Sequence, residues 1–488
     1  MKSKAMWEII RKFFKSTKKN EQQMNTDMTV QDFSPRLRQC YVALGVVLIS
    51  ISLGMVEGYS AILLPQLEKE GKMTIDYEMS SWIASIATLP TPLGCALGGL
   101  LMETIGRKTI HMVVCVPCLV GWVLLYFSTT TTHLLIGRFT TGICLGILGP
   151  PSGVYTAETS DPEFRGFLLG AISFAITLGV VIAHVLGTFI SWQNTALIGC
   201  IFPIACLVVM IQAPESPTFL AKKSKISAAK AAFYWCRGYG EAAEAELQEL
   251  LTRQTALAGL PRKSIMDYVK NLQQREFLKP LSITVVLFFT LQWTGINAMT
   301  FYNIEIVKLT LGDSLDVYTS MIIMDIIRLA TSVLACYLMK VIGRRPHILL
   351  SSIGTTLSLF TLSGFSFGVN YWPDLRNYSI YALVVLIVYM AFVTVGLFSI
   401  PWAMMGELFP LAHRGLGSGL SSLINYAFIF SVVKPTPWLL LNFGTEGTFL
   451  LFGVVGFMGS VVLGIFLPET KNKPLHEIED GFKKDVET

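Results

Sequence analysis

Long apolar segments alternate with short polar segments along almost the whole chain. A helix that crosses a bilayer needs about 20 mostly apolar residues, and the pattern contains twelve segments that meet this requirement. They lie near residues 43–64, 80–102, 110–128, 132–153, 166–190, 194–213, 279–301, 315–341, 346–368, 379–404, 416–440 and 447–467. The pattern therefore predicts an all-α membrane protein with twelve transmembrane helices.

One long polar segment, residues 214–278, divides these helices six and six. It is rich in Ala, Lys and Glu, as in SAAKAAFYW and EAAEAELQELL, and this composition favours short helices in water. The expected divisions are an N-terminal arm at 1–42, a six-helix bundle at 43–213, the linker at 214–278, a second six-helix bundle at 279–467 and a tail at 468–488.

The two halves repeat one another. The repeated pairs are METIGRK (102–108) with MKVIGRR (339–345), AETSDPEFRG (157–166) with GELFPLAHRG (406–415), and PESP (214–217) with PETK (468–471). Three echoes in the same order and at similar offsets indicate two homologous bundles. Transporters that rock two bundles about a central site have this layout.

Composition and charge agree with this class and add an orientation. The chain is 52% hydrophobic and only 15% charged, whereas soluble domains carry about 25% charged residues. The arm, GRK at 106–108, the linker, GRRPH at 343–347 and the tail are basic and fall on one side of the predicted helices. Because basic loops stay inside, we expect both termini in the cytoplasm and a multi-pass protein of the plasma membrane.

Three smaller features bear on location and chemistry. The sequon at Asn377 would face outside and could be glycosylated. The basic, partly apolar stretch WEIIRKFFK (7–15) is either a surface-bound amphipathic helix or part of a disordered tail, and no signal peptide is expected. Most of the nine cysteines lie inside apolar runs, so Cys115 and Cys118 favour helix packing over metal or redox chemistry.

The repeated motifs concentrate charge where helices are expected to meet the cytoplasm. One interpretation is that Glu and Arg side chains on neighbouring helix ends form ion pairs that hold the two bundles together in one state and separate in the other. The alternative is that the basic loops only set topology. The candidate gating residues are Arg107, Arg138, Glu158, Arg165, Glu215, Arg344, Arg345, Glu407, Arg414 and Glu469.

The full set of motifs resembles the sugar porters of the major facilitator superfamily, and within them the insect facilitated trehalose transporter-like branch. The matching stretches extend over nearly all of 43–471 and are GRK, GRFTTGICLG, YTAETSDPEFRG, PESPTFL, TGINAMTFY, GRRP, PWAMMGELFP and PETK. The resemblance implies the major facilitator fold of two pseudo-symmetric six-helix bundles. It also implies a membrane carrier for a sugar that works by alternating access.

The resemblance also implies a substrate site. Its expected residues are Gln292 and Asn297 on the seventh helix, Gly396 and Trp402 on the tenth and Asn425 on the eleventh, with Phe301 and Tyr302 as an outer gate. Amides suit a neutral polyol because they both donate and accept hydrogen bonds. Asn and Gln also bridge membrane helices, and a Trp can anchor an interface, so structural roles stay open.

Several positions depart from the family pattern. Ser173, Leu291 and Arg328 stand where relatives place substrate-contacting amides, so we expect recognition to differ from that of glucose carriers. Thr218 and Lys340 replace charged residues of the PESPR and second D-x-x-G-R-R patterns.

The stretch MIIMDIIRLATSV (321–333) carries two charges in an apolar segment. Asp325 and Arg328 are three residues apart and could pair on one helix face. Either the pair fixes a helix contact, or Arg328 donates hydrogen bonds into the central cavity and alters what is carried. Both interpretations place these charges in the interior, because charge facing lipid is costly.

The first predicted helix bears on the energy source of transport. Proton-driven relatives carry an Asp in the first-helix pattern GYDTG, and here Ser60 takes its place, which favours passive facilitated diffusion. The alternatives are a proton symporter that uses Glu57, or a non-transporting sugar receptor. We expect a small-molecule sugar and the lipid bilayer as partners, a monomer, and no nucleic-acid binding, cofactor, metal site or enzymatic activity.

Overall fold

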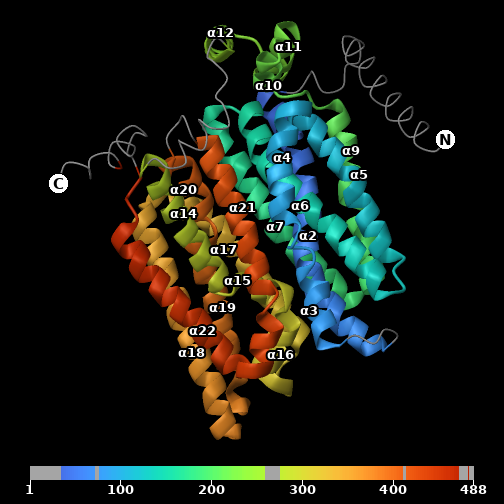
Figure 1. Ribbon diagram of the computed structural model, residues 1–488, viewed down its shortest axis with the longest axis vertical. Helices are drawn as coiled ribbons and strands as arrows, with labels where there is room; N and C mark the ends of the chain where they lie inside the picture. Colours follow the sequence, from blue (N-terminus) through green and yellow to red (C-terminus); the bar gives the residue numbers. More distant parts are fainter. Residues whose placement is uncertain (1–33, 72–75, 259–274, 410–413, 472–481, 483–488) are drawn as a thin grey trace.

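The computed structural model describes residues 34–71, 76–258, 275–409, 414–471 and 482. Within these residues the chain forms long helices joined by short turns, and no strand is present. Figure 1 shows the helices running side by side along the long axis of the molecule, with three short helices at one end. The stretch at 7–15, for which a surface helix was one expectation, lies outside the described residues.

The first half of the chain supplies six membrane-crossing segments, two of which are built from two helices each. These helices are α2 (Pro35–Glu70), α3 (Tyr77–Ser85), α4 (Thr91–Ile105), α5 (Arg107–Tyr126), α6 (Thr131–Thr159), α7 (Pro162–Phe189), α8 (Trp192–Gly199) and α9 (Ile201–Gln212). The linker then forms α10 (Pro217–Lys222), α11 (Ile226–Arg237) and α12 (Glu241–Ala258).

The second half repeats this arrangement with more interruptions. Its helices are α14 (Arg275–Trp293), α15 (Ile296–Phe301), α16 (Asn303–Leu311), η1 (Gly312–Ser314), α17 (Val317–Val341), α18 (Arg344–Tyr371), η2 (Pro373–Tyr378), α19 (Ser379–Phe392), the π-helix η3 (Val393–Phe398), α20 (Ile400–Leu408), α21 (Arg414–Val433) and α22 (Thr436–Phe466). We call the end that carries α10–α12 the linker end and the opposite end the far end (Figure 1).

The membrane class predicted from the apolar pattern is confirmed. In the described part of the chain, eleven helices are long and apolar enough to cross a bilayer, and the broken pair α3 and α4 supplies a twelfth segment. Helices are the natural choice for such spans because each one bonds its own backbone polar groups where no water is present.

Some helix boundaries predicted from the sequence are wrong. The predicted span 80–102 is interrupted by a turn that ends at Pro90, and 279–301 is interrupted at Gly295, which has a φ of 88°. A side chain rarely tolerates that backbone angle, so a glycine is needed there. Residues 436–440, predicted as the end of the eleventh helix, instead begin α22, which then bends at Gly444.

Glycines let the helices of the first half approach closely. Gly94 and Gly98 on α4 lie against the backbone of α6 around Ile147, and a Cβ added to Gly98 would lie only 2.9 Å from the carbonyl carbon of Ile147. This is the small-residue packing by which membrane helices associate without a hydrophobic driving force. The α2–α7 contact uses glycines in the same way.

The two halves meet along two seams. Helix α7 of the first half packs against α17 of the second half, and α4 packs against α21. Helix α2 also contacts α15 and α16, which continue the seventh segment. The interior between these helices is therefore lined by both halves.

Substitution of two neighbouring glycines on α4 tests the packing of α4 against α6. We expect Gly98→Ala to destabilise the protein by about 1–3 kcal/mol through overpacking. Gly99→Ala is the matched control, because nothing lies within 4 Å of a Cβ at that position, and the change should be neutral or stabilise the helix by up to about 1 kcal/mol. Thermal unfolding in detergent measures both. Equal midpoints for the two variants would contradict the packing argument.

Candidate functional site

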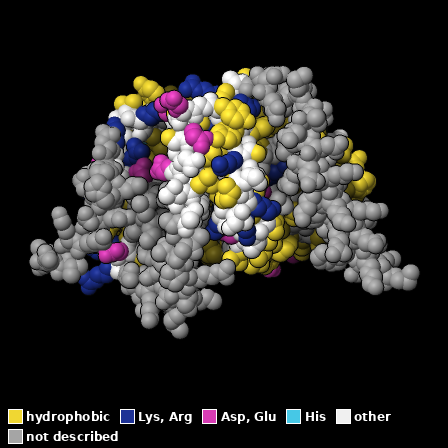
Figure 2. Space-filling view, turned by 90° about the horizontal axis from the view of Figure 1, so that it is seen from above, with side chains coloured by type: hydrophobic (Ala, Val, Ile, Leu, Met, Phe, Trp, Pro, Cys, Tyr) yellow, Lys and Arg dark blue, Asp and Glu magenta, His cyan; other side chains and the backbone are white. Residues whose placement is uncertain are grey.

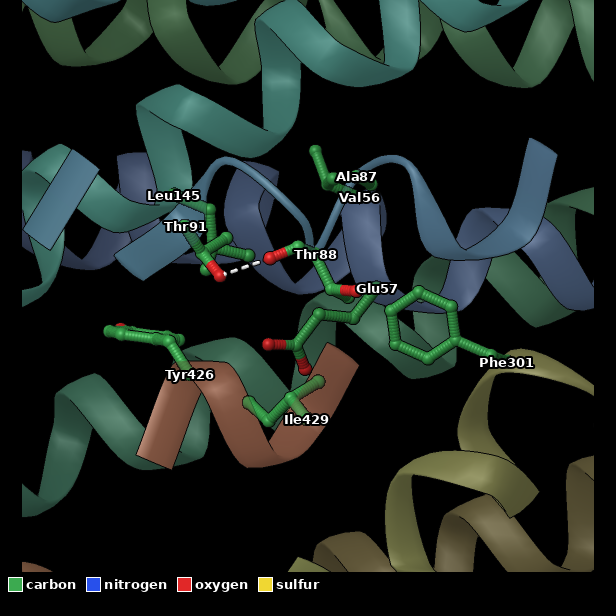
Figure 3. Close-up of a pocket in the computed structure, with 9 residues that line it drawn as sticks. All are labelled: Val56, Glu57, Ala87, Thr88, Thr91, Leu145, Phe301, Tyr426 and Ile429. Atoms are coloured by element: carbon green, nitrogen blue, oxygen red, sulfur yellow. Dashed lines mark hydrogen bonds between the residues drawn. The ribbon is translucent and has the colours of Figure 1, made fainter. Parts of the chain in front are cut away.

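A small cavity lies between the two halves. Figure 3 shows the carboxylate of Glu57 pointing toward Tyr426 and Ile429 on the opposite half, with the ring of Phe301 beside it. The residues that line the cavity are Val56, Glu57, Ala87, Thr88, Thr91, Leu145, Phe301, Tyr426 and Ile429. The wall is mostly apolar with a few polar groups, which is typical of small-molecule sites.

Three buried amide side chains form a hydrogen-bonded chain. One of them, Asn425, directly precedes the cavity-lining residue Tyr426 in the sequence. The Asn297 Nδ2 donates to Gln292 Oε1 at 2.6 Å, and the Gln292 Nε2 donates to Asn425 Oδ1 at 2.8 Å. Among the described residues, the Asn297 Oδ1 and the Asn425 Nδ2 have no hydrogen-bond partner. This amide chain joins α14, α15 and α21 and keeps one acceptor and one donor available at its two ends.

The other predicted substrate residues lie apart from the cavity lining. Trp402 is 37% exposed, and its ring stands edge-on to Phe288 with centroids 5.3 Å apart. Gly396 lies in η3, where the Leu397 N–H donates to Ser351 Oγ at 2.9 Å, so its lack of a side chain lets α18 approach. Ser173 on α7 is exposed.

The predicted outer gate consists of two buried aromatic residues at the end of α15. Phe301 is 1% exposed and lines the cavity, and Tyr302 is 2% exposed directly after it. Both are thus fully inside the molecule in this conformation.

Arg328 and Asp325 do not pair with each other in the way the sequence suggested. The Arg328 Nη1 donates to Thr300 Oγ1 at 2.8 Å, and its guanidinium lies 5.4 Å from the centre of the Phe398 ring. The Asp325 Oδ2 instead lies 2.6 Å from the Nδ1 of His184 on α7, in the other half. All three charged or ionisable side chains are at most 1% exposed.

His184 was missed by the sequence interpretation. It is the one ionisable residue in the apolar stretch GVVIAHVLG (179–187). An ionisable group at membrane depth is itself a signal of function, and this signal could have identified His184 without a structure.

The repeated motifs form a network at the linker end of the first half. The Arg107 Nε lies 3.0 Å from Glu158 Oε2, and its Nη2 lies 2.9 Å from Glu103 Oε1. Glu215 has a different role: its Oε1 accepts from the backbone N–H groups of Arg107 and Lys108 at 2.8 and 2.9 Å. The carboxylate therefore caps the N-terminus of α5, where the helix dipole favours negative charge.

The second half repeats this network. The Arg344 Nη2 lies 2.9 Å from Glu407 Oε1, and Glu469 accepts from the backbone N–H groups of Arg344 and Arg345 at 2.9 and 3.1 Å, capping α18. Burial disfavours the charged form of Glu469, but the backbone N–H groups of Lys471 and of these two arginines outweigh it and lower the pKa of its carboxyl below the usual value.

These networks differ from the predicted gating pairs. None of the described ion pairs at the linker end joins the two halves, so the pairs brace each half, or tie the linker to the first half, rather than hold the halves together. Arg138 lies elsewhere: it is fully buried and donates to the Val56 carbonyl oxygen at 2.6 Å and to Ser60 Oγ. Among the described residues Arg165 forms no ion pair with Glu158, and the side chain of Arg414 lies outside them. Figure 2 views the molecule from the linker end, where acidic and basic side chains gather.

Contacts between the halves instead close the far end. The Ser81 Oγ on α3 donates to the Lys434 carbonyl oxygen at 2.8 Å, and the Lys434 ammonium lies 3.9 Å from the centre of the Trp82 ring. A cation over an indole ring contributes up to about 2 kcal/mol when it is shielded from water. Lys434 and Trp82 were not predicted, although a lysine at the end of an apolar segment is a visible signal.

The cap on α5 can be tested by mutation. We expect Glu215→Ala to destabilise the protein by about 1.5–3 kcal/mol, because several N–H groups lose a charged acceptor. Glu163→Ala is the control: its ion pair with Arg36 is 3.8 Å long and 74–89% exposed, and its loss should cost less than about 1 kcal/mol. Thermal unfolding compares them, and a larger effect at Glu163 would refute the capping role.

Comparison with known proteins identifies a family and several relatives of this chain. The sequence profile of the family described as "Sugar (and other) transporter" matches residues 11–482. The facilitated trehalose transporter Tret1 of Drosophila yakuba is 32% identical over 444 residues, which are 90% of this chain but 51% of that protein. The chain thus spans about half the length of that relative. The facilitated trehalose transporter Tret1-2 homolog of Drosophila simulans is 32% identical over 445 residues, or 90% of both chains.

Solved structures show the same fold. The proton:xylose symporter XylE bound to 6-bromo-6-deoxy-D-glucose superposes with a TM-score of 0.73, 22% identity, and coverage of 92% of this chain and 100% of that one. The partially occluded inward-open form of XylE from E. coli gives a TM-score of 0.74 at 20% identity, covering 89% of this chain and 99% of that one. At these identities the likeness establishes the major facilitator fold and nothing further.

Proposed function

This chain belongs to the Sugar (and other) transporter family, and from that membership we propose that it carries a sugar across the membrane by alternating access. The observation that carries the proposal is the amide chain of Asn297, Gln292 and Asn425 beside a cavity between the two halves. Its free acceptor and donor suit the hydroxyl groups of a neutral sugar, which both donate and accept. No covalent chemistry is part of this function, so the protein is not an enzyme.

The surroundings of the amide chain support a sugar of hexose or trehalose type. Arg328 adds donors at this depth, because Thr300 occupies only one of its N–H groups. We propose that Arg328 shifts recognition toward a substrate rich in acceptor oxygens. Trp402, Gly396 and Ser173 are proposed to complete the path on the linker side.

Movement of the two halves supports transport. We propose that residues 43–213 and 279–467 act as two rigid bodies, because the networks around Arg107 and Arg344 brace each half internally. The contact of Lys434 with Ser81 and Trp82 closes the far end here, and Phe301 and Tyr302 seal it from within. Opening the far end would break these contacts while leaving each half intact.

The distribution of basic residues supports an orientation of the protein in the membrane. We propose that the linker end faces the cytoplasm, with both termini there, because basic residues concentrate at that end. Asn377 on η2 is exposed at the opposite side and is proposed as a glycosylation site. The protein is proposed to act as a monomer in the plasma membrane, without nucleic-acid partners.

Passive transport is favoured by the surroundings of Arg138. Ser60 stands where proton-driven relatives carry an Asp, and its hydroxyl accepts a hydrogen bond from Arg138. The remaining described acceptors of Arg138 are backbone carbonyl oxygens of Val56, Ile83 and Ala84. A carboxylate that could exchange a proton is therefore replaced by neutral groups at this position.

The amide chain is tested by uptake in oocytes with radiolabelled glucose, trehalose, polyols and organic acids. We expect saturable uptake of at least one sugar, reduced at least about tenfold by Gln292→Ala or Asn425→Ala, because one lost hydrogen bond to a buried group costs about 1–3 kcal/mol. Asn442→Ala on the exposed face of α22 is the control and should transport like the unmodified protein. No sugar flux above water-injected oocytes would refute the carrier and favour a receptor.

Passive transport is tested by accumulation. In vesicles with an imposed inward proton gradient, we expect the internal sugar concentration to rise to the external one and to stop there. A protonophore should leave this final level unchanged, because no proton gradient drives the sugar. Accumulation above the external concentration that the protonophore abolishes would show symport instead.

A further inference from the structure

The wall of the cavity between the halves carries one charged side chain, that of Glu57 on α2. Figure 3 shows its carboxylate pointing across the cavity toward α21, with the ring of Phe301 beside it. Within the described part of the chain this carboxylate accepts no hydrogen bond and forms no ion pair. A carboxylate that is held away from bulk water without a partner is strongly disfavoured, so its partner has to come from the molecule that fills the cavity.

The hydroxyl groups of the cavity wall do not supply this partner. The Thr88 Oγ1 donates to the Ser85 carbonyl oxygen at 2.8 Å, and the Thr91 Oγ1 donates to the Thr88 carbonyl oxygen at 2.6 Å. Each threonine therefore uses its proton on the backbone and keeps only acceptor lone pairs. The Tyr426 hydroxyl is directed to α6, where a Cβ on Gly149 would lie 2.7 Å from it. The wall around the carboxylate thus offers acceptors and needs donors.

The second half offers the opposite polarity. The Asn425 Nδ2, at one end of the amide chain, is a donor without a partner among the described residues, and Asn425 directly precedes Tyr426 of the cavity wall. A hydroxyl group suits both sides because it donates one hydrogen bond and accepts others. A molecule with neighbouring hydroxyl groups therefore fits this cavity, whereas a molecule that only accepts hydrogen bonds leaves Glu57 unpartnered.

A positively charged partner for Glu57 is disfavoured by a nearby arginine. The buried Arg138 guanidinium donates at 2.6 Å to the carbonyl oxygen of Val56, which directly precedes Glu57 and also lines the cavity. This fixed positive charge balances the negative charge of the carboxylate, so an ammonium group on the ligand would leave an excess charge away from water. Neutral hydroxyl groups add no charge and still form charge-assisted hydrogen bonds with a carboxylate.

We propose that Glu57 is a specificity-determining residue whose carboxylate accepts hydrogen bonds from two neighbouring hydroxyl groups of the transported sugar. The two carboxylate oxygens lie side by side, as do hydroxyl groups on adjacent ring carbons, so one carboxylate receives both. The ring of Phe301 offers an apolar face to the C–H groups of the sugar ring. The inference rests on the proposed function, and it adds a sugar contact from the first half to the amide chain of the second half.

Replacement of single sugar hydroxyl groups by fluorine tests this contact, because fluorine is similar in size but cannot donate a hydrogen bond. The labelled probe is D-glucose, or trehalose if glucose is not taken up by oocytes. The unlabelled competitors are deoxyfluoro forms of the same sugar, changed at one position (in both rings for trehalose). We expect two adjacent positions at which fluorine weakens the inhibition of uptake at least about tenfold, because hydrogen bonds to a charged group are among the stronger ones.

Two variants with the same chemical change assign this loss to Glu57. In Glu57→Gln one acceptor oxygen becomes a donor amide, so the affinity for the unmodified sugar should fall at least about tenfold. The fluorine penalty should shrink below about threefold at one or both of the two positions, because the sugar group and the carboxylate act as a pair. Glu249→Gln, on the exposed face of α12, should retain both the affinity and the fluorine penalties.

The outcomes that contradict the proposal are distinct from a failure of the proposed function. Inhibition that no single fluorine weakens in the unmodified carrier would overturn the proposal without any variant. Equal fluorine penalties in Glu57→Gln and in the unmodified carrier would also overturn it, because a purely structural role changes abundance but not the ratio between a fluorinated sugar and its parent. Glu57→Asp, which withdraws the carboxylate by one methylene, replaces Glu57→Gln if that variant does not reach the membrane, and the same shrinkage is expected. Absent uptake of every sugar refutes the proposed function instead.

Discussion

The structure depends on close contact between helices. The lipid that surrounds the helices provides no hydrophobic driving force for this contact. Lipid tails are as apolar as the side chains they touch, so helices associate through tight packing and polar contacts. Gly54 on α2 meets Ile176 of α7 at a distance that no larger residue could occupy, and Gly58 packs tightly against Val180 and His184. This contact brings the His184 ring against α2 and sets the depth at which the charged side chains of both halves meet.

Polar contacts are distributed differently within each half and between the halves. Within each half, an arginine, a glutamate from a neighbouring helix and a capping glutamate tie the helix ends together at the linker end, as at Arg107 and Arg344. Between the halves, the described polar contacts are few and involve Lys434 and the His184–Asp325 pair. A change in the relative position of the halves would therefore break few described polar contacts.

Neutral and charged polar groups are separated in the interior. The amide chain through Gln292 offers hydrogen bonds without net charge, whereas the cluster around Arg328 holds charge that must be balanced. Thr300 joins the two regions, because it accepts from Arg328 and lies on the same short helix as Asn297. Helix α15 therefore connects the amide chain to Arg328.

The sequence alone determined the membrane class and the family, because apolar length and short motifs are local properties of the chain. It also singled out Gln292, Asn297 and Asn425, whose contact with substrate stays a prediction. It did not predict the break at Gly295, and it placed the boundary between the last two spans near Gly444, which lies inside α22. The tertiary structure decided the partners: Asp325 binds His184 rather than Arg328, Glu215 caps α5 rather than pairing across the halves, and Lys434 covers Trp82. His184 and Asp325 are 141 residues apart, and only the packing of α7 on α17 determines which of several nearby charges a side chain meets.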